Sequence, residues 1–187
     1  MSTYFSGKGS EFTKETARLA VARAKELGIT EFVIASNLGP SARALIEELG
    51  GDGSGVAVVT HAAGFKEPFS MEMGEVERTE ISRTGASVIT AGHALSGVER
   101  GLSSKHQGSY PALIMADTLR LFGQGMKVAV ECAVMAADAG ALSGGRIVSI
   151  GGSGRGADTA VVMTPGHAAK IFEQATIHEI ICKPGLY

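Results

Sequence analysis

The segment with the strongest chemical signature is IASNLGPSA (residues 34–42), where a short apolar run breaks into small polar residues and glycine. Gly39 permits a tight turn, and Pro40 suits the first position of a helix. Ser36 and Ser41 supply hydroxyl groups. Free N–H groups at the start of such a helix, together with the positive end of its dipole, can bind a phosphate. The alternative is that Ser-x-x-Gly-x-Ser is only a capped helix start, and the pattern alone does not separate these interpretations.

A second glycine-rich segment, IGGSGRGADT, joins two apolar runs at residues 150–159. A plain hairpin needs one or two turn glycines. This segment has four, which indicates close approach of the backbone to a ligand. Arg155 can reach an anionic or planar group. A G-x-G-x-x-A pattern is present, but the dinucleotide-binding motif opens a helix and here a strand follows, so the pattern is weak evidence for NAD.

Other polar candidates are isolated residues. His61 follows the run VAVVT, which ends at Thr60, and lies either at the same sheet edge or in a solvated loop. Glu131 interrupts the apolar run VAVECAVMA. In one interpretation its carboxylate points into a cleft. In the other, which we favour, it lies on a solvated stripe or makes a structural hydrogen bond. The stretch HALSGVERG contains His93, Ser96 and Arg100, which would form a wall or lid of the site.

No residue is an evident catalytic group. There is no GxSxG motif, no GxxxxGK[ST] motif and no pair of histidines at helical spacing. In a strand, His178 and Cys182 would lie roughly 13 Å apart, too far to share a metal ion, so we expect no metal site. Cys132 lies within an apolar helical pattern, which indicates core packing.

Apolar periodicity predicts the elements that must position these residues. The first helix extends over residues 13–28, with Thr13 as its N-cap and Gly28 as its stop. Further helices are expected at residues 41–49, before Gly85, and at 110–122, 126–139 and 167–174. Short strands are expected at residues 3–6, 32–35, 56–60, 86–90, 146–150, 159–164 and 177–182, and a long irregular loop at 91–109.

Strands that alternate with helices indicate a parallel sheet. The turn between Ile150 and Thr159 is too short for a crossover helix, so these two strands must pair antiparallel. We therefore predict an α/β fold, a three-layer αβα sandwich whose mostly parallel sheet has an antiparallel edge strand. Ligands of such sheets bind beyond the carboxyl ends of the strands, where the strand order reverses.

Composition limits the classes of function. The 187 residues fit one domain (1–187), 44% of them are hydrophobic, and the net charge is −2. Dispersed basic residues argue against a nucleic-acid partner, and no apolar run reaches the roughly 18 residues of a membrane span. Two cysteines and no recognisable secretion signal favour a cytoplasmic location. The 26 glycines, about twice the usual share, cluster at turns.

Several of these segments together resemble a known family. The strand, Ser-x-x-Gly-x-Ser turn and helix, with RIVSIGGSGRGADTAVVMTP, are similar to the C-terminal α/β domain of pyruvate kinase in its small, stand-alone archaeal form. TARLAVARAKELGI, HALSGVER, MKVAVECAVMAADAGAL and EIICKP extend the resemblance along nearly the whole chain. The catalytic barrel of pyruvate kinase has no counterpart here, so the resemblance does not imply pyruvate kinase activity.

The resemblance implies a cleft associated with FMN. Ser36, Asn37, Gly39 and Ser41 would hold a phosphate, opposite the loop Gly151, Gly152, Ser153, Gly154, Arg155, Gly156, Ala157 and Asp158. We add Thr60, His61 and Glu131 as candidate contacts. The first loop lacks the basic side chain expected for a doubly phosphorylated sugar, which favours a single phosphate.

The resulting prediction is a protein that binds FMN or a similar small phosphorylated ligand. Two alternatives remain open: an FMN-dependent oxidoreductase, and a sugar-phosphate sensor that acts through a homo-oligomer.

Overall fold

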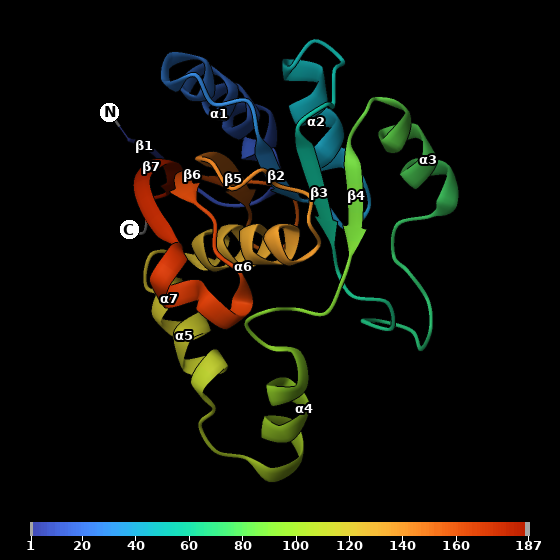
Figure 1. Cartoon of the computed structure of the whole chain (residues 1–187), viewed down its shortest axis with the longest axis vertical. Helices are drawn as coiled ribbons and strands as arrows, with labels where there is room; N and C mark the ends of the chain where they lie inside the picture. Colours follow the sequence, from blue (N-terminus) through green and yellow to red (C-terminus); the bar gives the residue numbers. More distant parts are fainter. Residues whose placement is uncertain (1, 186–187) are drawn as a thin grey trace.

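Short runs rich in valine, isoleucine and alanine form the central strands of a seven-stranded sheet in the computed structural model, which describes residues 2–185 (Figure 1). The strands are β1 (Thr3–Phe5), β2 (Phe32–Ala35), β3 (Val56–Thr60), β4 (Ser87–Thr90), β5 (Ile147–Gly151), β6 (Thr159–Thr164) and β7 (Thr176–Pro184). The α-helices are α1 (Thr13–Leu27), α2 (Pro40–Glu48), α3 (Glu75–Arg83), α4 (Gly97–His106), α5 (Pro111–Arg120), α6 (Gln124–Asp138) and α7 (Ile171–Gln174). Two 3₁₀ turns, η1 (Ser10–Phe12) and η2 (Ala168–Lys170), precede α1 and α7.

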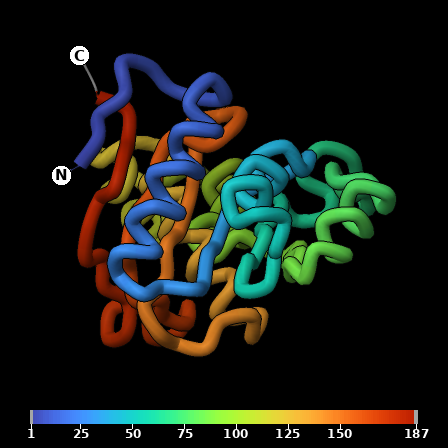
Figure 2. The backbone as a smooth tube through the Cα atoms, turned by 90° about the horizontal axis from the view of Figure 1, so that it is seen from above, coloured from blue at the N-terminus to red at the C-terminus, as the bar shows by residue number. Residues whose placement is uncertain are grey.

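The strand order is β1-β7-β6-β5-β2-β3-β4, and every neighbouring pair is parallel except the two pairs that involve β6. The predicted antiparallel pairing of β5 with β6 is confirmed, with Ile150 opposite Ala160. The antiparallel strand β6 lies towards the β1 edge of the sheet, between β5 and β7. β1 and β7, near the two ends of the described chain, lie side by side (Figure 2).

Helices cover both faces of the sheet, as predicted (Figure 1). Successive side chains of a strand point to opposite faces, so a run that is apolar throughout can contribute to two cores. Along β2, Ile34 packs in the cluster beneath α1 and α2, whereas Val33 packs in the cluster formed with α6. Nearly the whole of α6 is buried, which explains its almost uninterrupted apolar sequence. No helix within residues 2–185 has both the length and the hydrophobicity needed to cross a membrane.

Two local predictions are wrong. Residues 91–109 are not an irregular loop, because they include the ten-residue helix α4, which lies well away from the sheet (Figure 1). No residue of α4 is buried, so the helix lacks the apolar stripe by which it could have been recognised. The N-cap of α1 is Phe12; Thr13 is already helical, and its hydroxyl accepts a hydrogen bond from Ala157 N–H at 3.0 Å. The predicted end of α1 at Gly28, in the left-handed conformation, is confirmed.

Candidate functional site

The carboxyl ends of β2, β3, β4 and β5 form one edge of the sheet. From β2 the chain continues through α2 to β3 on one side, and β5 pairs with β2 on the other side. This reversal is the position at which open α/β sheets bind ligands. The loops that follow these four strands contain nearly all of the predicted site residues.

Two hydrogen bonds of Ser36 hold the turn between β2 and α2 in place. Ser36 N–H donates to Val59 O at 2.9 Å, and Ser36 Oγ accepts from Ala42 N–H at 3.3 Å. Gly39 has φ of 105°, a conformation that glycine adopts without strain, and α2 then starts at Pro40 as predicted. The N-cap of α2 is Gly39, and Ser36 satisfies one N–H group in the first turn of the helix.

Four backbone N–H groups of this turn, at Asn37, Leu38, Gly39 and Ser41, have no hydrogen-bond partner within residues 2–185. They stand at the positive end of the α2 dipole. The turn therefore combines an internally capped start with donors that remain free for an anion.

A carboxylate lies against this turn. A Cβ atom at Gly39 would overlap the carboxylate of Glu77, which α3 contributes. Arg43 donates to Glu77 through Nε at 2.6 Å and Nη2 at 2.7 Å, and it also pairs with Glu80. These hydrogen bonds hold the pKa of Glu77 below its usual value, so the carboxylate is ionised. An anion that approaches the α2 N-terminus therefore meets both a negative group and an arginine.

The loop after β5 is held by a buried carboxylate. Asp158 Oδ2 accepts from Gly9 N–H at 2.8 Å and from Ser153 N–H at 3.1 Å. Its Oδ1 accepts from the Thr159 hydroxyl at 2.9 Å. All of these partners belong to the protein, so Asp158 fixes the shape of the loop against the segment before α1.

The glycines of this loop approach the protein's own backbone at three of their four positions. A Cβ atom at Gly151 would overlap Gly125 O, one at Gly152 would overlap Gly156 O, and one at Gly156 would overlap Ser10 Cα. The remaining position, Gly154, has open space around it. Internal packing thus explains most of the glycine excess that the sequence suggested was for a ligand. Ala157 takes part in this packing through its N–H bond to Thr13, and Arg155 is exposed.

Beyond β3, His61 is held on both sides of its ring. Asn37 Oδ1 accepts from His61 N–H at 2.8 Å, which directs Asn37 Nδ2 towards His61 Nε2 at 3.0 Å. Nε2 is therefore the acceptor, and Nδ1 donates to Glu72 Oε2 at 2.5 Å. Burial alone would raise the pKa of Glu72, but hydrogen bonds from Lys66 and His61 lower it. The contact between Asn37 and His61 joins two predicted site residues from different loops.

Flat groups from three segments gather around His61. We call His61, Phe65, His93 and Arg100 the ring cluster. The Phe65 ring is stacked on His61 with centroids 3.9 Å apart, and the His93 ring lies 5.4 Å from each of them. The Arg100 guanidinium carbon lies 5.6 Å from the Phe65 centroid. Burial is the main reason that the pKa of His93 is lowered, with a contribution from nearby cations that include Lys127.

Glu131 holds the segment that carries His93 of the ring cluster. Its Oε1 accepts from Leu95 N–H at 2.9 Å, and its Oε2 pairs with the buried Lys127. These contacts agree with the interpretation that Glu131 makes structural hydrogen bonds, because both of its carboxylate oxygens are bonded to groups of the protein. Thr60 is likewise engaged: its hydroxyl lies 2.7 Å from the Thr90 hydroxyl and joins β3 to β4.

Five residues of this edge were not predicted: Arg43, Phe65, Glu72, Glu77 and Lys127. Phe65 had one available signal, since it is an aromatic residue in the loop that directly follows His61. Arg43, Glu72 and Glu77 come from helices or loops whose polar residues look like an ordinary solvated face. Lys127 lies one turn before Glu131 on the apolar helix α6.

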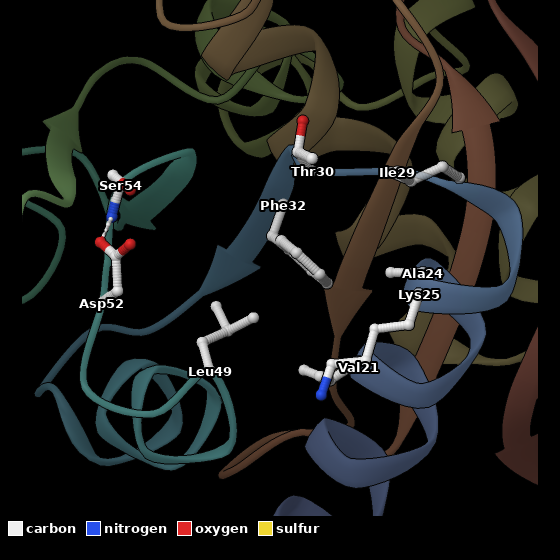
Figure 3. Close-up of a pocket in the computed structure, with 9 residues that line it drawn as sticks. All are labelled: Val21, Ala24, Lys25, Ile29, Thr30, Phe32, Leu49, Asp52 and Ser54. Atoms are coloured by element: carbon white, nitrogen blue, oxygen red, sulfur yellow. Dashed lines mark hydrogen bonds between the residues drawn. The ribbon is translucent and has the colours of Figure 1, made fainter.

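A shallow depression of about 270 Å³ lies at the opposite edge of the sheet (Figure 3). Val21 and Lys25 of α1, Phe32 at the start of β2, and Asp52 are among the residues that line it. It contains none of the predicted site residues, and Asp52 in its lining already accepts a hydrogen bond from Ser54 N–H. The carboxyl edge therefore remains the candidate site. No protein-family model matches the chain.

Proposed function

We propose that this protein binds a small phosphorylated ligand, FMN being the best candidate, at the carboxyl edge of its sheet. The observation that carries the proposal is the pairing of Asn37 with His61. It joins a turn with free N–H donors to a cluster of flat side chains. FMN has the two matching parts, a phosphate and a planar ring.

The phosphate is assigned to the turn between β2 and α2. Leu38, Gly39 and Ser41 present N–H groups there, and hydrogen bonds to a charged acceptor contribute roughly 1.5–3 kcal/mol each. The loop after β5 is a weaker candidate, because Asp158 and close backbone packing occupy most of its groups. Arg155 and the open position at Gly154 are its available parts.

The test compares FMN with riboflavin, which differs only in lacking the phosphate. In a flavin fluorescence titration, FMN should bind at least tenfold more tightly, since one charge-assisted hydrogen bond contributes that much. Ser41→Ala keeps the backbone N–H group but removes the Ser41 hydroxyl, which is a further candidate donor to the phosphate. It should therefore weaken FMN and leave riboflavin unchanged, so that the difference between the two affinities narrows. Ser54→Ala, at the opposite edge of the sheet, is the matched control and should change neither affinity.

Equal affinities for the two flavins in the wild-type protein would show that the phosphate is not recognised. Binding of sugar phosphates without binding of either flavin would replace FMN by a sugar-phosphate ligand at the same turn. Thermal shift with each compound separates these cases, because a ligand that binds only the folded state raises the melting temperature.

A further inference from the structure

We infer that the ring cluster is a subsite for a flat heteroaromatic ring that carries hydrogen-bond acceptors on its edge. This inference rests on the proposed function and assigns the part of the ligand that the α2 turn does not hold. Planar side chains from three separate segments converge there: His61 and Phe65 after β3, His93 after β4, and Arg100 on α4.

The Phe65 ring is partly open to solvent on the side away from His61. Its inner face is stacked on His61, yet the residue is still 40% exposed. The Arg100 guanidinium covers it loosely, because 5.6 Å to the centroid is close to the limit of about 6 Å for a cation–π contact. Within the described chain no carboxylate pairs with Arg100, so this side chain can move to the edge of an incoming ring. With Arg100 moved to the edge, a ring on Phe65 would be stacked on one face and would meet a donor fork at its rim.

The charges around the cluster favour an electron-rich rim. Glu72 is paired with Lys66 at 2.5 Å, and Glu131 is paired with Lys127, so both carboxylates are neutralised locally. Arg100 adds a positive charge without a carboxylate partner in residues 2–185. A ring edge with carbonyl oxygens, as in an isoalloxazine, complements this pattern, whereas a cationic ring does not.

The two histidines of the cluster are held in place and form a preformed part of its surface. His61 is fixed by Asn37 and Glu72, and the segment that carries His93 is tied to Glu131 through Leu95 N–H. Phe65 lies in a more open turn, closed by the hydrogen bond from Gly64 N–H to Ser70 O. Preformed surfaces bind with less loss of conformational entropy.

The test uses Phe65→Leu, which removes the flat ring but keeps an apolar side chain. It should weaken FMN and riboflavin by the same factor, about tenfold, because stacking contributes roughly that much per ring. Glycerol phosphate, which has no ring, should shift the melting temperature as much as in the wild type. Phe69→Leu is the matched control, since Phe69 belongs to the same loop but is fully exposed.

A conservative variant and a second site keep the test decisive. Phe65→Trp preserves a flat ring and should restore affinity; Arg100→Gln should weaken both flavins several-fold. Circular dichroism establishes that each variant is folded. Suppose that the wild type binds FMN, and that Phe65→Leu and Arg100→Gln both bind FMN with wild-type affinity. The ring assignment is then overturned, and the proposed function stands. If the wild type binds neither flavin but does bind glycerol phosphate, both the ring subsite and FMN fall.

Discussion

At the scale of single residues, Glu77 should weaken the attraction of the proposed phosphate site in the α2 turn for an anion. Its ionised carboxylate lies against Gly39 and shares Arg43 with Glu80. Glu77→Gln removes the charge and keeps the shape. Two unit charges about 4 Å apart interact by about 1 kcal/mol in water, so FMN should bind roughly fivefold more tightly to the variant. Riboflavin should be unaffected, and the gain should shrink in high salt.

The matched control is Glu75→Gln, which removes a carboxylate from the same first turn of α3. A flavin titration at low salt compares the two variants directly. Weaker FMN binding in Glu77→Gln would mean that Glu77 serves to position Arg43 for the phosphate, the opposite of simple repulsion. An equal gain in both variants would indicate a general effect of net charge.

Residue types in the sequence identified the α2 turn but not its electrostatics. Gly39 and Pro40 indicate a turn and the start of a helix, because few other residues suit those backbone conformations. Glu77 lies 38 positions later in a polar helix, and nothing in its neighbourhood shows that α3 places it on Gly39. Four glycines were likewise visible in the loop after β5, but their number does not distinguish approach to a ligand from approach to the backbone at Gly125 and Ser10.

At the scale of elements, α6 carries a buried ion pair that fixes the segment leading into α4. Lys127 and Glu131 are each 5% exposed and lie one turn apart, and Glu131 also accepts from Leu95 N–H. Lys127→Met leaves the carboxylate buried without its cation. Loss of one partner from a buried pair typically costs about 3–5 kcal/mol, so we expect a decrease of that size in the free energy of unfolding, measured in urea.

The double variant Lys127→Met/Glu131→Gln should recover most of this loss. Glutamine is neutral and keeps an oxygen for Leu95 N–H, so no buried charge remains. Arg18→Met, which breaks an exposed pair with Glu15 on α1, is the control and should leave stability nearly unchanged. If Lys127→Met is as mild as Arg18→Met, the carboxylate is already solvated or protonated and the pair does not hold the segment.

Elements with an apolar face could be predicted, and elements without one could not. The strands β2 and β3 were located at their observed bounds because short runs of valine, isoleucine and alanine fit a strand buried on both faces. Helix α4 was missed because it has no buried residue. Its contacts with the rest of the chain include Glu99, whose carboxylate accepts from Ala112 N–H at 2.8 Å at the start of α5, and Arg100, whose guanidinium lies over the Phe65 ring. Scattered polar contacts of this kind leave no periodic apolar pattern.

At the scale of the whole molecule, the sheet separates two apolar cores, and each core contains one of the two cysteines. Cys132 lies on α6 in one core, and Cys182 lies on β7 in the other. The general α/β architecture was predictable because alternating strands and helices admit few topologies. The assignment of each side chain to a core required the strand register, which the structure supplies.

The two thiols should therefore report the opening of both cores. Burial raises the pKa of Cys132 and of Cys182 to about 12, so at pH 8 neither forms the thiolate that reacts with disulfide reagents. We expect almost no labelling of the native protein, and labelling of both thiols at one common rate as urea populates the unfolded state. Cys132→Ala and Cys182→Ala each leave a single thiol and identify which core opens. Rapid labelling of Cys182 alone in native buffer, with no dependence on urea, would show instead that the β1–β7 edge opens locally.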